Sequence, residues 1–182
     1  MSVEARAFLR LLQVEMTALP DGAGALWSND KYWTRSMVGD GATRKAAQPD
    51  YGAVGRVGAK LGYKRQAEYL RIDQIWYQEE RPPNWTIEAY IEHENSLGRL
   101  DMTVRKLLSV GPGLKVLVTY PGARKDHALD ATERLLRERH GTSPDGRIFL
   151  VFGALDRERD RMRLEGHEFD GLGRRCSVIP TG

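Results

Sequence analysis

The feature that most constrains the fold is a pair of strand-like stretches, residues 67–78 and 84–94, separated by a turn. Both stretches are rich in β-branched and aromatic residues, which favour strands. Between them lie Pro82 and Pro83, which cannot donate backbone hydrogen bonds to a sheet. The sequence therefore predicts an antiparallel β-hairpin, and the rest of the chain has to pack around it.

One face of the second predicted strand is acidic. Strand side chains alternate between faces, so one face carries Glu88, Tyr90, Glu92 and Glu94 and the other Ile87, Ala89, Ile91 and His93. The second face is mainly apolar and should face the core, with His93 as a buried, hydrogen-bonded residue. A turn centred between the prolines places Asp73 opposite Glu92, with Cβ atoms about 4.5–5.5 Å apart. Three carboxylates, those of Asp73, Glu92 and Glu94, are therefore predicted to converge.

Carboxylates this close raise one another's pKa unless a cation compensates for their charge. Mg²⁺ suits such a site because it binds through one or two carboxylates and keeps several waters, and Mn²⁺ accepts the same oxygen ligands. A metal held in this way acidifies a bound water and neutralises charge on a phosphoryl group. The pattern thus favours metal-dependent hydrolysis of a phosphodiester. The alternative is an ordinary exposed strand face whose acids are neutralised by Arg71 or by a lysine of the next helix.

The remaining periodicities predict an α/β fold, a mixed β-sheet with helices on both faces. Helices are expected at residues 2–18, 51–64, 97–110 and 126–140, and further strands at 114–120, 148–152 and 161–169, the last on the sheet edge. Residues 20–50 are expected to be irregular but partly packed through Trp27, Tyr32 and Trp33, and Asp156–Arg161 to form a solvated turn. The length of 182 residues suits a single domain, 1–182, with a core at about 67–155 and a helical and irregular region at 1–64.

The residues around the two acids resemble the PD-(D/E)xK nuclease superfamily, which includes many restriction enzymes and DNA-repair nucleases. In that family an aspartate at a strand start pairs with an (Asp/Glu)-x-Lys on the next, antiparallel strand, and a helix and another strand follow. Asp73 in LRIDQIWY matches the first acid, and Glu92-His93-Glu94 in YIEHENS matches the second element, with Glu94 in place of the lysine. Residues 97–110 and the stretch LKVLVTY match the helix and strand that follow.

This resemblance implies a restriction-endonuclease-like fold and a Mg²⁺-dependent deoxyribonuclease. Asp73 and Glu92 would hold the metal, and Glu15 of the first helix would add the further acid that many family members have. Either Glu94 completes the site and positions water, or Lys106 reaches in from the following helix. One alternative is a catalytically inactive nucleic-acid-binding or regulatory module on the same fold. Another is an interaction domain whose acids bind a basic partner.

Charge and composition suggest further partners. Arg56, Lys60 and Lys64 recur every four residues, with Arg65 adjacent, and would suit DNA phosphates, although such a face is often merely solubilising. Cleavage of both strands of a duplex favours a homodimer, because each chain carries one such site. No apolar run approaches the roughly 18 residues that span a bilayer, so no membrane association is expected. The N-terminus lacks signal-peptide features and Cys176 is the lone cysteine, so a cytoplasmic location is expected.

Overall fold

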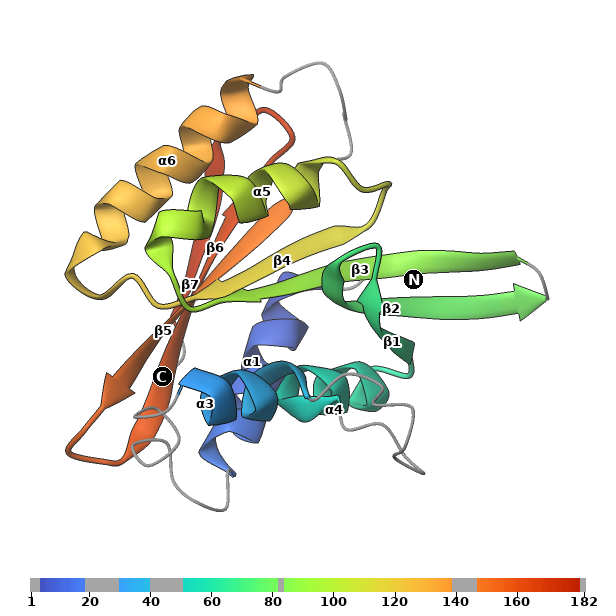
Figure 1. Ribbon diagram of the computed structural model, residues 1–182, viewed down its shortest axis with the longest axis horizontal. Helices are drawn as coiled ribbons and strands as arrows, with labels where there is room; N and C mark the ends of the chain where they lie inside the picture. Colours follow the sequence, from blue (N-terminus) through green and yellow to red (C-terminus); the bar gives the residue numbers. More distant parts are fainter. Residues whose placement is uncertain (1–3, 19–29, 40–50, 82–83, 139–146, 181–182) are drawn as a thin grey trace.

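The computed structural model describes residues 4–18, 30–39, 51–81, 84–138 and 147–180. A seven-stranded sheet with strand order β1-β2-β3-β4-β5-β6-β7 forms its centre (Figure 1). The strands are β1 (Lys64–Tyr69), β2 (Ile72–Arg81), β3 (Asn84–Glu94), β4 (Leu114–Thr119), β5 (Ile148–Asp156), β6 (Arg161–Phe169) and β7 (Arg175–Pro180). The helices are α1 (Ala5–Thr17), α3 (Asp30–Val38), α4 (Gly52–Lys60), α5 (Leu100–Leu108) and α6 (Lys125–Glu138), and the short 3₁₀ turns Leu97–Arg99 and Gly122–Arg124 precede the last two.

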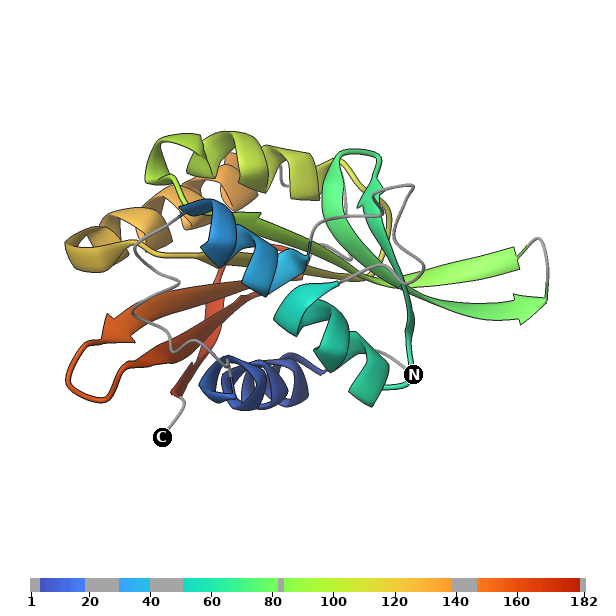
Figure 2. The same cartoon turned by 60° about the horizontal axis from the view of Figure 1, so that its bottom comes forward.

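The sheet is mixed. Strands β1, β2 and β3 form an antiparallel meander, β3, β4 and β5 run parallel, and β6 and β7 return antiparallel. Parallel neighbours require crossover connections, which α5 and α6 supply on the same face of the sheet. Helices α1, α3 and α4 cover the other face, as the two views in Figures 1 and 2 show. The predicted α/β architecture, with a mixed sheet between helices, is therefore confirmed.

The predicted register of the β2–β3 hairpin is also confirmed near the acids. Gln74 pairs with Ile91 and Trp76 with Ala89, the pairs expected for a turn between the two prolines. A bulge follows between Trp76 and Tyr77, so the register shifts only on the side toward the turn. Asp73 and Glu92 therefore occupy facing positions just beyond the Gln74–Ile91 pair.

The structure differs from the predicted extents and order of several elements. The stretch 67–78 is not one strand, because Leu70 and Arg71 adopt positive φ and turn the chain between β1 and β2. The helix predicted at 51–64 ends at Lys60, and its last residues enter β1. Strand β6 is not an edge, because β7 pairs with it, and the sheet extends beyond the predicted core on both sides, from Lys64 to Pro180.

The region 20–50 contains order that the sequence did not predict. Helix α3 forms within it and buries Trp33, whose exposed fraction is 2%, so the expectation that this tryptophan packs is confirmed. Trp27 and the side chain of Tyr32 lie outside the described residues. The solvated turn at 156–161 is confirmed, because residues 157–160 form an exposed turn between β5 and β6. In the described part of the chain, no helix has the length and apolarity needed to cross a membrane.

Helix α4 contains glycines because it packs closely on the sheet. Gly58 is buried, and a Cβ atom built on it would lie 2.8 Å from Cε2 and Nε1 of the Trp76 indole. Trp76 is itself fully buried and packs between Phe8 and Tyr63, with ring centroids 5.4 and 6.0 Å away. The glycine therefore lowers helix propensity but allows α4 to approach β2.

Replacing Gly58 by alanine is expected to destabilise the fold by about 1–3 kcal/mol, because overpacking against Trp76 outweighs the gain in helix propensity of about 1 kcal/mol. Urea unfolding followed by tryptophan fluorescence measures the change. Gly98→Ala is the matched control, since its nearest neighbour would be 3.6 Å from the new Cβ. Equal or greater stability of Gly58→Ala would contradict this account of α4 packing.

Candidate active site

The candidate site lies where β2 begins and β3 ends. Asp73 is the second residue of β2. Glu92 and Glu94 are alternate residues at the end of β3, so both side chains lie on the same face of the strand. All three project toward the face covered by α5, since their strand neighbours Ile75 and Tyr90 pack in the core on that side. The hairpin register thus brings together side chains that are 19 to 21 positions apart in the sequence.

Asp73 and Glu92 hold each other's strands through reciprocal hydrogen bonds. The Asp73 backbone N–H donates to Glu92 Oε1 at 3.0 Å. The backbone N–H of His93 donates to Asp73 Oδ2 at 2.8 Å. Each carboxylate therefore accepts a hydrogen bond from the opposite strand, which partly offsets the cost of placing two acids side by side.

Lys106 reaches this pair from α5. Its Nζ lies 2.7 Å from Glu92 Oε2, and Glu92 is only 4% exposed. The helix presents Lys106 because its apolar residues Leu100, Val104 and Leu107 pack on the sheet and leave one flank along the acids. Of the two alternatives left open by the sequence, the structure therefore places the Lys106 ammonium in contact with the acidic site.

Glu94 is held differently. Its Oε1 accepts the backbone N–H of Ser96 at 2.8 Å, and its Oε2 accepts the Thr103 hydroxyl at 3.4 Å. These contacts tie the carboxylate to the chain entering α5. Among the described residues no group of three or more His, Cys, Asp or Glu side chains is placed to hold a metal ion. Glu94 nevertheless lines the same pocket as Asp73 and Glu92 and is close enough to raise the pKa of Asp73, so the three acids form a hydrogen-bonded pair with a third carboxylate beside it.

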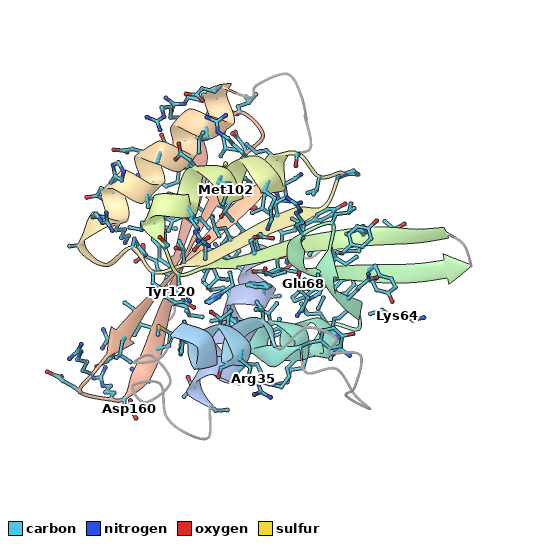
Figure 3. The ribbon with its side chains drawn as sticks, viewed as in Figure 1. Arg35, Lys64, Glu68, Met102, Tyr120 and Asp160 are labelled. Carbon is cyan, nitrogen blue, oxygen red and sulfur yellow. The ribbon has the colours of Figure 1, made fainter. Side chains whose placement is uncertain are left out.

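A pocket of about 560 Å³ opens over these residues. Its lining comes from the end of β3, the β1–β2 turn, α5 and α3: Thr34, Arg71, Asp73, Glu92, His93, Glu94, Asn95, Ser96, Arg99, Met102, Thr103 and Lys106. Figure 3 labels Met102 on α5 and Glu68 at the β1–β2 turn, the two elements that line the pocket from opposite sides. The acids are thus accessible from one direction, beside three cationic side chains.

Burial dominates the electrostatics of the pair. Burial and, after it, the Asp73 carboxylate raise the pKa of Glu92 to about 7, against the lowering effects of Lys106 and the Asp73 N–H. Burial also raises the pKa of Asp73, against the lowering effects of the His93 N–H and Lys106. Because the Glu92 carboxyl group retains its proton close to neutrality, the site has excess affinity for positive charge.

The far side of the β3 end is fixed by neutral hydrogen bonds. His93 is buried, its Nε2 lies 2.9 Å from the Tyr120 hydroxyl, and burial lowers the pKa of His93 to about 3. The prediction of a buried, hydrogen-bonded histidine is confirmed. The Asn95 side-chain amide donates to the Thr34 hydroxyl at 2.9 Å, which ties α3 to the edge of the pocket. These contacts position the strand end without adding charge.

Several predicted site residues lie elsewhere. Glu15 is on α1, on the opposite face of the sheet, where Arg56 Nε and Lys60 Nζ each lie 2.5 Å from its carboxylate. It does not join Asp73 and Glu92, because α1 packs in the other core. Lys64 and Arg65 are on β1, and the Arg65 guanidinium donates to the Gly55 carbonyl. The predicted placement of Arg56, Lys60 and Lys64 on one helix is therefore wrong for Lys64.

The sequence interpretation missed the arginines of the pocket. The sequence pattern assigns Arg71 only to neutralising the acids, and it marks residues 99–106 as basic without giving Arg99 a role of its own. A signal for the second existed, since Arg99, Thr103 and Lys106 recur at helical spacing and share a flank of the segment 97–110. Arg71 gave no such signal, because its position depends on an unforeseen turn.

The pH dependence of stability tests the burial of Glu92. Its pKa is raised in the folded state, so that state binds more protons and stability falls as the pH rises from the ordinary pKa of 4.5 through about 7. Glu92→Gln removes this titration. The free energy of unfolding of the variant minus that of wild type should therefore be about 2 kcal/mol larger at pH 8 than at pH 5. Metal-free urea unfolding at both pH values measures it. A pH-independent difference would show that Glu92 does not titrate as described.

The sequence matches no protein-family model and no curated protein. The geometry of the pocket is consequently the main evidence on function. Its distinguishing elements are the hydrogen-bonded Asp73–Glu92 pair, the Lys106 ammonium and the arginines at its rim.

Proposed function

We propose that this chain is a metal-dependent deoxyribonuclease with a restriction-endonuclease-like fold, which hydrolyses DNA phosphodiester bonds. The observation that carries the proposal is the hydrogen-bonded pair of the half-buried Asp73 and the buried Glu92, contacted by Lys106, in a pocket open to solvent. Carboxylates with a raised pKa in a cleft are typical of functional sites, because burying them costs stability.

The connectivity around the pair supports the fold. An antiparallel meander β1-β2-β3 leads through α5 to β4, which is parallel to β3. Asp73 stands at the start of one strand of the meander, and Glu92 and Glu94 stand at the end of the next. This is the arrangement that the resemblance to PD-(D/E)xK nucleases implies.

The donor set fits Mg²⁺ or Mn²⁺. Mg²⁺ in phosphate-handling sites is commonly held by one or two carboxylates, with waters and substrate oxygens completing the coordination. Asp73 and Glu92 supply two carboxylates, and the pocket has room for water and a phosphate beside them. When bound, the metal would neutralise charge on the phosphate and lower the pKa of a water.

The side chains of the pocket have distinct proposed roles. Lys106 balances the charge of Glu92 and can donate a hydrogen bond to a phosphate oxygen as negative charge develops. Arg71 and Arg99 lie at the rim, where they can hold flanking phosphates. Glu94 keeps α5, and with it Lys106, in place through Ser96 and Thr103.

One observation favours the alternative, an inactive nucleic-acid-binding or regulatory module. Lys106 already pairs with Glu92, and Glu94 is satisfied by its own hydrogen bonds, so the pocket is partly neutralised from within. A homodimer and the binding of DNA by Arg56, Lys60, Lys64 or Arg65 stay predictions.

Purified protein should cut plasmid DNA with Mg²⁺ or Mn²⁺ and not with EDTA. Asp73→Asn and Glu92→Gln should each reduce the rate at least about 100-fold, because each removes a charged metal ligand. Glu88→Gln is the matched control, a glutamate further back on β3 that does not line the pocket. Gel electrophoresis of time courses measures cleavage, and circular dichroism shows that the variants are folded. Metal-independent DNA retardation without cleavage would favour the inactive module instead.

Lys106→Met should lower the cleavage rate about 100-fold while leaving the chain folded, because it removes a donor that stabilises developing charge. Lys125→Met is the control, since Lys125 also pairs with a glutamate, Glu165, but on α6 and outside the pocket. Single-turnover kinetics separate a loss of rate from a loss of DNA binding. Equal activity of Lys106→Met and wild type would remove Lys106 from the proposed mechanism.

A further inference from the structure

The β1–β2 turn has an unusual backbone for its sequence. Tyr69 pairs with Ile72, so the turn consists of Leu70 and Arg71, whose φ angles are 50° and 68°. Glu68, just before the turn, has φ of 55°. Two-residue turns with positive φ at both positions normally carry Asn-Gly, because side chains larger than asparagine are strained there. The chain instead holds a leucine and an arginine in this conformation.

Both turn residues face solvent next to the carboxylate pair. Leu70 is 72% exposed, the highest value among the exposed large hydrophobic side chains that the structure describes. Arg71 is exposed and lines the pocket, two residues from Asp73. Strained backbone that presents an apolar side chain to water is disfavoured on both counts, so its presence at a pocket points to a contact with a ligand.

The opposite side of the pocket repeats this chemistry. Met102 of α5 is 62% exposed, and Arg99, which precedes α5, is exposed as well. Both line the pocket. The pocket thus offers two guanidinium groups and the exposed Met102, and the exposed Leu70 is the chain neighbour of Arg71, a set that matches a ligand with both phosphate and apolar surface.

We propose that the Leu70–Arg71 turn is a wedge for DNA with unpaired bases at the cleavage position. Arg71 binds a phosphate next to the scissile bond, and Leu70 packs against an unstacked base. The inference rests on the proposed nuclease function and specifies its substrate class.

The apolar side chains are what select this substrate. Intact B-DNA presents phosphates and sugars outward, and arginines alone are enough to hold them. A leucine or methionine gains contact area only where a base has left the stack, as when apolar side chains insert at kinked base steps. Unpaired bases are already unstacked or cost least to unstack, so they fit the wedge without further distortion of the DNA.

Leu70→Asn separates this role from a structural one. Asparagine tolerates positive φ, so the variant should unfold at a temperature about 2 °C higher than its parent if the turn is strained. The same variant should lose about tenfold in affinity for a fluorescent duplex with a central mismatched bubble and little for the fully paired duplex. Both binding assays use the Glu92→Gln background in EDTA, so that no cleavage occurs. Leu172→Asn is the matched control, an exposed leucine in the β6–β7 turn that should change neither affinity.

The outcomes distinguish the two proposals. Bubble DNA bound no more tightly than paired DNA, or a bubble preference that survives Leu70→Asn, would overturn the wedge even if wild type cuts DNA. A bubble preference that depends on Leu70, in a wild-type protein that never cuts, would support the wedge and overturn the nuclease. Failure to bind either DNA would overturn both. A loss of thermal stability in Leu70→Asn would show that Leu70 serves the fold.

Discussion

The candidate site depends on the reciprocal hydrogen bonds between β2 and β3. Asp73 and Glu92 each accept a backbone N–H of the opposite strand, so the two acids act as ladder contacts as well as chemical groups. These hydrogen bonds fix the orientation of both carboxylates relative to the sheet. They also explain how the half-buried Asp73 and the buried Glu92 remain adjacent, since charge-assisted bonds to backbone N–H groups stabilise the ionised form. Every other group at the site is placed relative to this pair.

The surrounding elements follow from the topology. Because β4 is parallel to β3, the chain has to cross over, and α5 does so on the face that carries the acids. The same apolar stripe that anchors α5 leaves Lys106 toward Glu92. On the other face, His93 and Asn95 attach the strand end to Tyr120 and to α3. The crossover helix that connects the parallel strands β3 and β4 therefore also supplies the Lys106 ammonium.

Strand alternation and the two prolines were sufficient to predict the Asp73–Glu92 register, because local pleat and turn position determine which residues face each other. The same logic did not predict that Glu94, in the same pocket, bonds to Ser96 and Thr103. It failed for Glu15 as well, because a helix stripe indicates burial without indicating which face of the sheet buries it. The turn at Leu70 and Arg71 could not be read, since neither residue type favours positive φ. Local patterns thus predicted the hairpin, and long-range packing decided which charges join it.

Lys106 and a divalent cation compete for the same charge under the proposed function. With its pKa raised to about 7, Glu92 exchanges a proton near neutrality, and Lys106 already contacts the oxygen that does not accept the Asp73 N–H. A cation bound by the pair would take over the compensation that Lys106 now provides. Lys106 is partly exposed, so its ammonium is able to turn from Glu92 toward a phosphate without leaving the pocket. Release of the Lys106 ammonium from Glu92 would link metal binding to substrate contact through one side chain. It also gives a physical reason for a lysine on α5 in a chain whose β3 strand carries Glu94 at the position of the motif lysine.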